Sequence, residues 1–347
     1  MKKIPVAILG ATGMVGQKFI ELLHLHPWFE IVALAASPQS IGKKYKDVVY
    51  WLMPSILDSK IGNMKMQSCH PGFPCQIVFS ALDSSVAEEI EKQFAEDGYI
   101  VVSNCKNYRM HPNVPLIVPE VNADHLDLVK TQTFSKKGMI VTNPNCSVIG
   151  ITLALKPLID KIALSKIHIV TLQAISGAGH PGVASLDILD NIIPYIDGEE
   201  EKLETEPLKI LGSLERNAIK PHAISISAQC NRVAVNDGHM ACISIQTEEK
   251  IQRQEIIDLW NNFHGNSYTK SLPSAPKTPI VYHEEKAHPQ PKKHRLLENG
   301  MGVSIGRLRE CPLFSWKFIV LTHNTIRGAA GSAILNAELL VKNGFVE

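Results

Sequence analysis

The sequence predicts an α/β fold in two parts: a doubly wound parallel sheet, followed by an α+β part with a largely antiparallel sheet. Three observations predict it. A glycine-rich turn follows an apolar strand close to the start, and strand and helix patterns then alternate as far as residue 142. Beyond residue 146, long strands follow one another with few helices between them. Alternating strands and helices are typical of a parallel sheet, whereas successive strands indicate an α+β arrangement.

The first part begins with an apolar strand at residues 6–9, a turn at 10–13 and a helical spacing of apolar residues at 15, 19, 22 and 23. Apolar runs then predict strands at 31–36, 76–82, 100–102, 116–118 and 139–141, with a helix at 86–97. This order of elements is that of a doubly wound sheet, in which helices cover both faces.

The second part begins with an apolar helix at 148–159, followed by strands at 167–174, 223–235, 240–247, 302–309 and 314–322. Ile224, Ile226 and Ala228 alternate with polar residues, so one face of this sheet should be buried by helices or by a second subunit. The small-residue helix at 328–340 is expected to return to the first part. We therefore predict a first domain at 1–145, completed by 325–347, and a second at 146–324.

Composition limits the class of protein. With 347 residues, 45% of them hydrophobic, the chain can bury two cores. Its formal net charge of +1 provides no overall field for nucleic acid or an anionic membrane surface. Apolar runs are too short for a membrane span or a signal peptide, so we expect a cytoplasmic protein with small-molecule partners. The seven cysteines include no Cys-x-x-Cys pair, and we expect them all to be reduced.

The turn after the first strand has glycines at Gly10, Gly13 and Gly16. Glycines between a first strand and a first helix let backbone N–H groups approach a pyrophosphate, which indicates a Rossmann-type dinucleotide-binding domain. NAD enzymes commonly have an acidic residue after the second strand, and this chain has none there. Ser37, Ser40 and Lys43 instead suit a ribose 2′-phosphate, although polar loops are common. The interpretation is NADP as cofactor.

Cys146 is the candidate nucleophile. It follows a strand and the run Asn-Pro-Asn, and an apolar helix begins directly after it. A cysteine at the first turn of a helix is close to unpaired N–H groups and the positive end of the helix dipole. Both favour the thiolate, so we expect a reactive thiol at this position.

Two further runs have residues suited to catalysis. The run 173–185 begins with Gln173 and contains Ser-Gly-Ala-Gly, and the run 232–240 contains Arg232 and His239. A guanidinium can hold a carboxylate with two parallel hydrogen bonds, and a histidine in a glycine-bearing turn can act as an acid or base. Taken singly, each residue is equally consistent with a structural role.

Together these motifs resemble the aspartate-semialdehyde dehydrogenase family over nearly the whole chain. Asn-Pro-Asn-Cys146, the run 181–188 and the run 199–202 resemble its archaeal and fungal branch most. The resemblance implies reversible, NADPH-dependent reduction of L-4-aspartyl phosphate to L-aspartate 4-semialdehyde and phosphate, through an acyl thioester on a cysteine. That reaction leads to lysine, threonine, methionine and isoleucine, which makes the protein an oxidoreductase of amino-acid biosynthesis.

The resemblance also implies roles for particular residues. Cys146 would be the acyl-thioester nucleophile and His239 the acid/base. The implied substrate-binding residues are Gln173, Arg232, Arg109, Glu199, Lys202 and Asn104. The implied cofactor-binding residues are Gly10, Thr12, Gly13, Met14, Val15, Ser37, Ser40, Lys43, Ser80, Ala81, Leu82, Ser176, Gly177 and Asn324. Cys105 departs from the family pattern, which has a small residue there, and adds a second thiol near the cleft.

Several alternatives stay open. A related malonyl-CoA or succinyl-CoA reductase would keep the thiol, the histidine and NADPH, and a catalytically silent dinucleotide-binding sensor would keep only the fold. The stretch 271–295 contains His283, His288 and His294 and is interpreted as a solvated loop rather than a metal or phosphate site, because no Cys or carboxylate stands at metal-site spacing. No metal is therefore expected. A homodimer or homotetramer is expected, because the second sheet needs cover.

Overall fold

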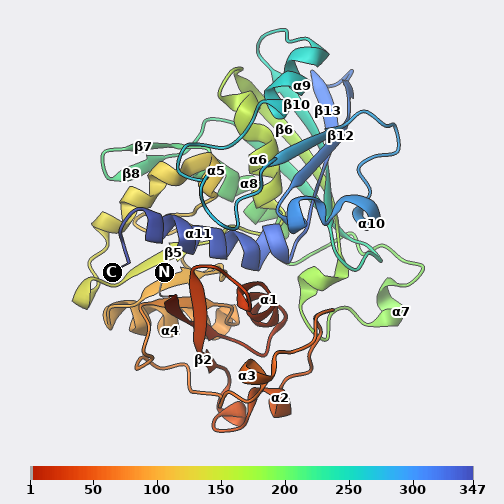
Figure 1. Ribbon diagram of the computed structural model, residues 1–347. Coiled ribbons are helices and arrows are strands. Elements are labelled where there is room, and N and C mark those ends of the chain that lie inside the picture. Colours follow the sequence, from red (N-terminus) through yellow and green to blue (C-terminus); the bar gives the residue numbers. More distant parts are fainter. Residues whose placement is uncertain (1–2, 347) are drawn as a thin grey trace.

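The computed structural model describes residues 3–346, which form two sheet-centred units joined along one side (Figure 1). The first unit holds a five-stranded sheet, and the second holds a six-stranded sheet. Helix α11 (Gly331–Lys342) comes last in the chain and lies between them in this view. Among the described residues, no helix is long and apolar enough to cross a membrane.

The first sheet is entirely parallel, in the order β2-β1-β3-β4-β5. Its strands are β1 (Ile4–Leu9), β2 (Phe29–Ala35), β3 (Ile77–Ser80), β4 (Ile100–Ser103) and β5 (Met139–Thr142). Helices α1 (Met14–Leu23) and α11 pack on one face, and α4 (Ser84–Glu96) packs on the other. This confirms the doubly wound sheet.

The strand expected at 116–118 is wrong as a full strand. Only Leu116 forms an isolated parallel bridge, with Thr142 of β5. Prolines explain the short pairing: Pro115 has no N–H to donate, and Pro119 begins the short helix α5 (Pro119–Asn122). The segment therefore extends the sheet edge by a single bridge before the chain turns away.

The second sheet has the order β11-β12-β13-β10-β6-β9. Its strands are β6 (Leu164–Gln173), β9 (Ser225–Arg232), β10 (His239–Thr247), β11 (Ile280–His283), β12 (Val303–Glu310) and β13 (Trp316–Thr322). The sheet is mixed: three of its five strand pairings are antiparallel, in agreement with the expectation, while β6 pairs with β9, and β11 with β12, in parallel. Each of these two connections includes a helix, as a parallel crossover commonly does.

One face of the second sheet is buried against three helices: α6 (Val148–Ile159), α8 (Glu199–Ile210) and α9 (Arg253–Asn261). The sequence analysis named α6 but neither α8 nor α9. In β9, Ala228 and Cys230 are buried while Ser227 and Gln229 are exposed, so the predicted alternation and its cover by helices are confirmed.

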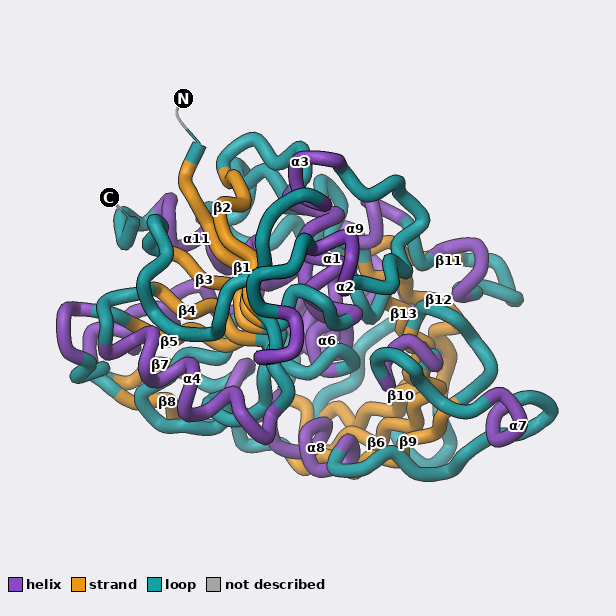
Figure 2. The backbone as a smooth tube through the Cα atoms, turned by 90° about the horizontal axis from the view of Figure 1, so that it is seen from below, coloured by secondary structure: helices purple, strands orange, loops and turns teal. Residues whose placement is uncertain are grey.

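The remaining α-helices and strands are short. They are the helices α2 (Tyr45–Val48), α3 (Ser59–Gly62), α7 (Ser185–Ile188) and α10 (Pro291–His294), and the hairpin β7 (Ser213–Glu215) with β8 (Ala218–Lys220). The loop that contains α7 projects from the body of the molecule (Figure 2). The stretch 271–295, expected to be a loop, instead includes β11 and α10.

Candidate active site

The glycine turn lies at the carboxyl ends of β1, β2 and β3, where parallel sheets bind ligands. Gly10 has φ +76°, and a Cβ there would lie 2.3 Å from the carbonyl oxygen of Ala81. A Cβ on Gly16 would lie 2.2 Å from the carbonyl oxygen of Gly10. These two glycines let the turn, β3 and α1 pack closely.

Gly13 has a different role. It is the exposed N-cap of α1, and within residues 3–346 no side chain caps the N–H groups of that helix. A pyrophosphate could accept those hydrogen bonds and would also gain from the helix dipole. Thr12, Met14 and Val15 stand beside this N-terminus, and Met14 and Val15 line the cleft described below. The turn therefore fits a dinucleotide.

The loop after β2 fits a 2′-phosphate. Ser37 and Lys43 are exposed and Ser40 is half-buried, just beyond the strand end. Across the edge, Ala81 donates its N–H to Leu9, and Leu82 lines the cleft. Ser80 is fully buried, with its hydroxyl 3.7 Å from the sulfur of Cys105. Its side chain thus supports the wall of the cleft.

Cys146 lies two residues before α6, as expected, in a cleft of about 380 Å³ between the two units. The expected thiolate at rest is wrong for this structure, because burial raises the pKa of the Cys146 thiol to about 12, and Glu199 adds to that rise. Arg109, Arg232 and Lys202 oppose it. The thiol is therefore protonated near neutral pH, and the nearby cations favour its anion.

Helix α8 presents one charged face to the cleft. Glu199, Lys202, Glu206 and Lys209 have the i, i+3, i+7, i+10 spacing of a single helix face. Glu206 accepts hydrogen bonds from Arg109 (Nη1 to Oε1, 3.0 Å) and from the backbone N–H of Asn145 (2.7 Å). It therefore links the arginine of one unit to the residue before the nucleophile.

Lys209 extends this support to the loop that carries Arg109. Its Nζ donates to the carbonyl oxygens of Arg109, His111 and Val114, at 2.7, 2.8 and 2.7 Å. Burial lowers the pKa of Lys209 to about 8. Asn104 accepts from Arg109 through its carbonyl oxygen at 2.7 Å. The guanidinium is thus held from both sides at the edge of the cleft.

Glu199 accepts hydrogen bonds from three polar side chains beside the thiol. It accepts from Lys202 at 2.7 Å, from the Asn145 side chain at 2.9 Å and from Gln173 at 3.2 Å. Burial acts to raise the pKa of Glu199, but these partners outweigh it and lower that pKa. An ionised carboxylate therefore stands near Cys146, where it could bind a substrate amino group.

His239 and Arg232 are joined through one residue. The N–H of Ala174 donates to Nδ1 of His239 at 3.0 Å, and Arg232 donates to the carbonyl oxygen of Ala174 at 2.8 Å. Burial lowers the pKa of His239 to about 3, so the ring is neutral. Since Nδ1 accepts, the proton is on Nε2, and this nitrogen has no partner among the described residues. His239 thus has an N–H available for a ligand.

Glycines bring the backbone close to these groups. A Cβ on Gly177 would lie 2.9 Å from Nη1 of Arg232 and 3.1 Å from Nε2 of His239. A Cβ on Gly328 would lie 2.9 Å from Cβ of Cys146. Gly328 belongs to a π-helical turn, Ile326–Ala330, that leads into α11. The site therefore depends on close backbone packing from both sides of the thiol.

Ser176 and Asn324 lie between the thiol and the nucleotide turn. The Asn324 side chain donates to the Ser176 hydroxyl at 2.8 Å and accepts from the N–H of Gly238 at 2.8 Å. Ser176, Gly177 and Asn324 all line the cleft with Met14. The nicotinamide half of a dinucleotide bound at α1 would meet this group.

Cys105 is buried beside the cleft. Its sulfur donates to the carbonyl oxygen of Leu82 at 3.1 Å. Burial raises the pKa of Cys105 to about 12, and the charge of Glu91 contributes. The second thiol is therefore close to the site, as expected, but is no more acidic than Cys146.

The comparisons with known proteins decide the family. Residues 5–129 match a family described as semialdehyde dehydrogenase, NAD binding domain, and residues 155–327 match semialdehyde dehydrogenase, dimerisation domain. Aspartate-semialdehyde dehydrogenases from Methanothermobacter thermautotrophicus and Schizosaccharomyces pombe are 44% and 46% identical, over 97% and 98% of this chain and 99% of each relative. The chain belongs to the aspartate-semialdehyde dehydrogenase family. The archaeal and fungal resemblance is confirmed.

A solved structure of this family agrees closely with the fold. The crystal structure of aspartate semialdehyde dehydrogenase with NADP from Candida albicans has a TM-score of 0.91 and 43% identity, covering 99% of both chains. NADP as the cofactor and the Rossmann-type domain are thereby supported in this family, together with a mixed-sheet dimerisation domain.

The structure brings most of the expected site residues together. Cys146, Asn104, Arg109, Glu199 and Lys202 line one cleft, and Gln173, Arg232 and His239 lie behind its wall. The sequence analysis missed Asn145, Glu206 and Lys209, as well as Lys106 at the cleft rim. The local pattern gave no signal for Glu206 and Lys209, because charged residues occur all round the helix 199–210 and a charged helix face usually faces solvent.

Proposed function

We propose that the protein catalyses the reversible, NADPH-dependent reduction of L-4-aspartyl phosphate to L-aspartate 4-semialdehyde and phosphate. One observation carries the proposal: a single cleft holds a thiol and a cationic side formed by Arg109 and Lys202, and a neutral histidine next to Arg232 lies directly behind its wall. The substrate has a phosphate at one end and an amino-acid carboxylate at the other. The site has a cation for each end.

Cys146 attacks the acyl carbon and displaces phosphate, which forms a thioester on the sulfur. The thiol is protonated before attack, so its proton leaves with the phosphate as hydrogen phosphate, and Arg109 and Lys202 stabilise the developing thiolate and the leaving group. When bound at the α1 turn, NADPH would supply the hydride that reduces the thioester. The tetrahedral intermediate on Cys146 then collapses to the aldehyde and a thiolate.

His239 acts at the carbonyl oxygen in this scheme. Its Nε2–H donates to the oxygen as negative charge develops, while Nδ1 stays bonded to Ala174. The same arrangement makes Nε2 an unsuitable acceptor for the thiol proton, since the neutral ring has its one lone pair on Nδ1. The role of His239 in this arrangement is therefore that of a hydrogen-bond donor to the oxyanion.

Arg232 and Glu199 would orient the amino-acid end. One terminal nitrogen of Arg232 is held by Ala174, which leaves the outer edge of the guanidinium for the substrate carboxylate. Glu199, ionised and held by Lys202, Asn145 and Gln173, would accept from the substrate amino group. Gln173 thereby contributes by holding Glu199 near Cys146.

The test is an assay of the purified protein with aspartate semialdehyde, NADP or NAD, and phosphate present or absent. Formation of NADPH that requires phosphate, or arsenate in its place, supports the proposal. A CoA-thioester reductase would respond to coenzyme A instead of phosphate, and a silent sensor would bind NADP without turnover. Either result would contradict the proposed reaction.

We also propose a homodimer or homotetramer. The second sheet has a half-exposed face that includes Val170, Leu172 and Met240, opposite the face covered by helices. The projecting loop around α7 exposes Leu186, at 91%, and Leu189, at 63%. Apolar surfaces of this kind are typical of subunit contacts. Light scattering of the purified protein gives the mass, and a monomer would contradict the proposal.

A cytoplasmic location and the domain limits complete the proposal. None of the seven cysteines is in a disulfide, and a working thiol needs a reducing compartment.

For the domain limits we propose 1–145 with 325–347, and 146–324. The apolar core shared by α1, α11 and the first sheet supports this division. Limited proteolysis that leaves 325–347 attached to residues 1–145 would support it, and loss of that segment with 146–324 would contradict it.

A further inference from the structure

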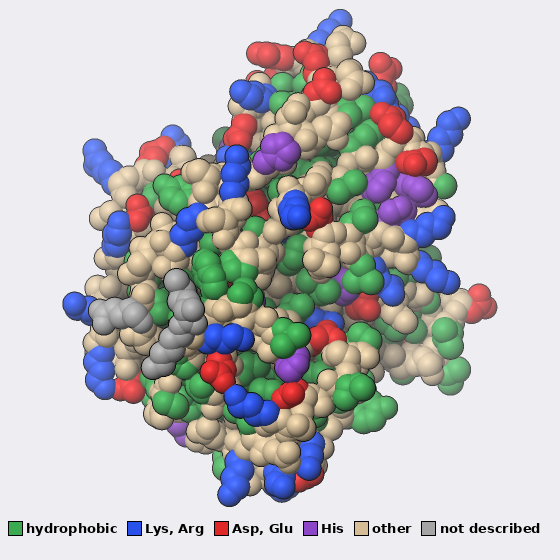
Figure 3. Space-filling model, viewed as in Figure 1, with side chains coloured by type: hydrophobic (Ala, Val, Ile, Leu, Met, Phe, Trp, Pro, Cys, Tyr) green, Lys and Arg blue, Asp and Glu red, His purple; other side chains and the backbone are tan. Residues whose placement is uncertain are grey.

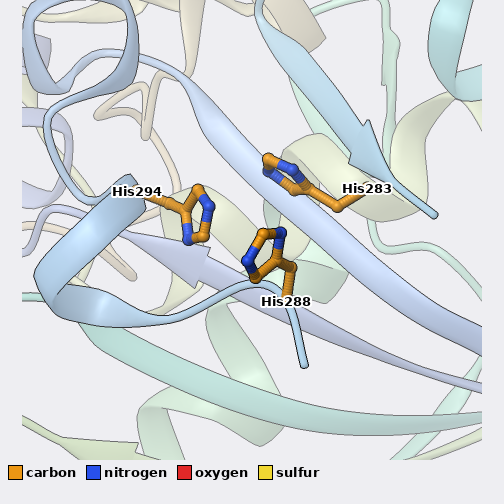
Figure 4. Close-up of side chains that lie close together, drawn as sticks. All are labelled: His283, His288 and His294. Atoms are coloured by element: carbon orange, nitrogen blue, oxygen red, sulfur yellow. The ribbon is translucent and has the colours of Figure 1, made fainter. Parts of the chain in front are cut away.

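Outside the cleft, three histidines gather at the far end of the second sheet. His283 ends β11, His288 lies in the loop after it, and His294 ends α10. Histidine side chains group at the surface on the side where Figure 1 places α10 (Figure 3). The close-up shows the three rings turned towards a shared centre from three separate backbone segments (Figure 4).

The distances are those of a nearly formed ligand set. Ring centroids lie 4.4 Å apart for His288 and His294, 4.6 Å for His283 and His294, and 5.7 Å for His283 and His288. One nitrogen from each ring can be chosen so that all three lie within 4.8 Å of one another. Tetrahedral ligation at a Zn–N distance of about 2.0 Å requires nitrogens about 3.4 Å apart, so small side-chain rotations suffice.

Two of the ring nitrogens in this cluster make no hydrogen bond within the described part of the chain. Nε2 of His283 and Nδ1 of His288 are buried and have no hydrogen-bond partner among the described residues. A buried, unsatisfied nitrogen is costly, and a ligand would remove that cost. Two of the three converging imidazoles thus have a buried nitrogen that no hydrogen bond to another described residue satisfies, which is hard to explain by a structural role alone.

His294 has the support that metal-binding histidines usually have. Its Nδ1 lies 3.1 Å from the carbonyl oxygen of Gln290. Donation from Nδ1–H to that oxygen leaves the lone pair on Nε2, which faces the other two rings. The N–H of Gln290 also lies 2.9 Å from the same Nδ1, so metal binding would select the donating tautomer over the accepting one.

We propose that His283, His288 and His294 form a binding site for one divalent transition-metal ion, with Zn²⁺ the best match. Three histidines and an open fourth position are a common zinc arrangement, completed by water. The carboxylate of Glu285 lies 3.5 Å from Nδ1 of His288 and can complete the set. This site lies apart from the proposed reaction and does not depend on it.

A bound ion would fasten α10 to the sheet. It would join the end of β11 to His294 and close the loop between them. Residues on both sides of His294 pack on the turn before His239: Arg295 donates to the carbonyl oxygen of Asp237 at 3.2 Å, and a Cβ on Gly238 would lie 3.1 Å from Cβ of Pro291. Metal binding would therefore stabilise a segment that supports the His239 turn.

The first test is calorimetric titration of chelator-treated protein with ZnCl₂. Cys146→Ser is used as the background, because the cleft thiol is a competing zinc ligand. One Zn²⁺ per chain is expected, with affinity reduced at least tenfold in His283→Ala and in His294→Ala. The matched control is His264→Ala, which removes an exposed histidine elsewhere and should leave affinity unchanged. Equal binding by all three variants, or no binding by the background protein, overturns the proposal.

A second test needs no histidine variant and so survives a folding defect. Zn²⁺ should protect the peptides containing His283, His288 and His294 from diethylpyrocarbonate, as measured by mass spectrometry on the unmutated chain. His264 should stay reactive. Cobalt substitution should give ligand-field absorption without a thiolate-to-metal charge-transfer band. Unprotected cluster peptides, or a thiolate band in the Cys146→Ser protein, would place the metal elsewhere and overturn the proposal.

Discussion

Two regions of the site are formed in different ways. They are the nucleotide edge, which is the glycine turn at the carboxyl ends of β1, β2 and β3, and the thiol cleft around Cys146. At the nucleotide edge, backbone groups form the site: Gly10 and Gly16 permit close packing, and Gly13 leaves the α1 N–H groups open. At the thiol cleft, side chains form it, through ion pairs and hydrogen bonds that join Arg109, Glu199 and Glu206. A backbone site tolerates changes of side chain, whereas a network of buried charges fails when one member is lost.

The largest effect is expected for a substitution that removes activity at the thiol cleft and leaves cofactor binding at the nucleotide edge unchanged. Cys146→Ala should abolish turnover in both directions, because no other thiol of the cleft can form the thioester. NADP affinity should remain within about twofold, since the α1 turn is untouched. Steady-state kinetics and fluorescence titration with NADPH measure the two quantities. If cofactor binding falls together with activity, the two regions are not independent.

Arg232→Lys should lower kcat/KM for aspartate semialdehyde by about 10- to 100-fold, although the charge is kept. Lysine cannot hold the Ala174 carbonyl and a substrate carboxylate with one planar group. Arg216→Lys, an exposed change, is the control. Unchanged kinetics in Arg232→Lys would remove Arg232 from the substrate site.

Glu199→Gln should speed alkylation of Cys146 by iodoacetamide several-fold at fixed pH. The carboxylate raises the pKa of Cys146 after burial, so its removal increases the thiolate fraction. Glu201→Gln, an exposed change on the same helix, is the control.

The alkylation measurement needs a Cys311→Ser background. Backbone hydrogen bonds at Leu313 and Phe314 outweigh the effect of burial and lower the pKa of the Cys311 thiol, which would react first. Mass spectrometry of the peptide containing residue 146 follows the reaction. An equal rate in Glu199→Gln and Glu201→Gln would mean that the charge of Glu199 does not act on the thiol.

The smallest effect concerns stability. The pKa of His239 is about 3 in the folded protein and about 6.5 unfolded. The unfolded chain therefore binds more protons between these values, and this residue lowers stability as pH falls from 6.5 towards 3, by about 1.4 kcal/mol per pH unit. His239→Gln should weaken the acid dependence seen in urea unfolding, and His264→Gln should not. Parallel curves for all three proteins would contradict a buried neutral His239.

The same contrast explains what the sequence could predict. The glycine turn and the position of Cys146 follow from local patterns of strand, turn and helix, and both are placed as expected. Glu206 and Lys209 were missed because their role depends on hydrogen bonds to residues about a hundred positions away in the chain. The resting thiol was mispredicted for a similar reason, since burial and Glu199 outweigh the local effect of a helix N-terminus.

The proposed metal site also depends on contacts between separate segments of the chain. Sequence spacing of His283, His288 and His294 matches no familiar pattern, and only the parallel pairing of β11 with β12 and the fold of α10 bring the rings together. Ligand sets assembled by tertiary structure from separate segments are poorly visible in a single sequence.

The contact between Gly328 and Cys146 has a consequence for how the chain can be divided. The segment that closes behind the nucleophile is synthesised after the whole second sheet, and α11 then packs beside α1. Until α11 has been synthesised, the first sheet has an apolar face uncovered. Independent expression of the two halves would therefore yield neither a soluble first half nor a working thiol.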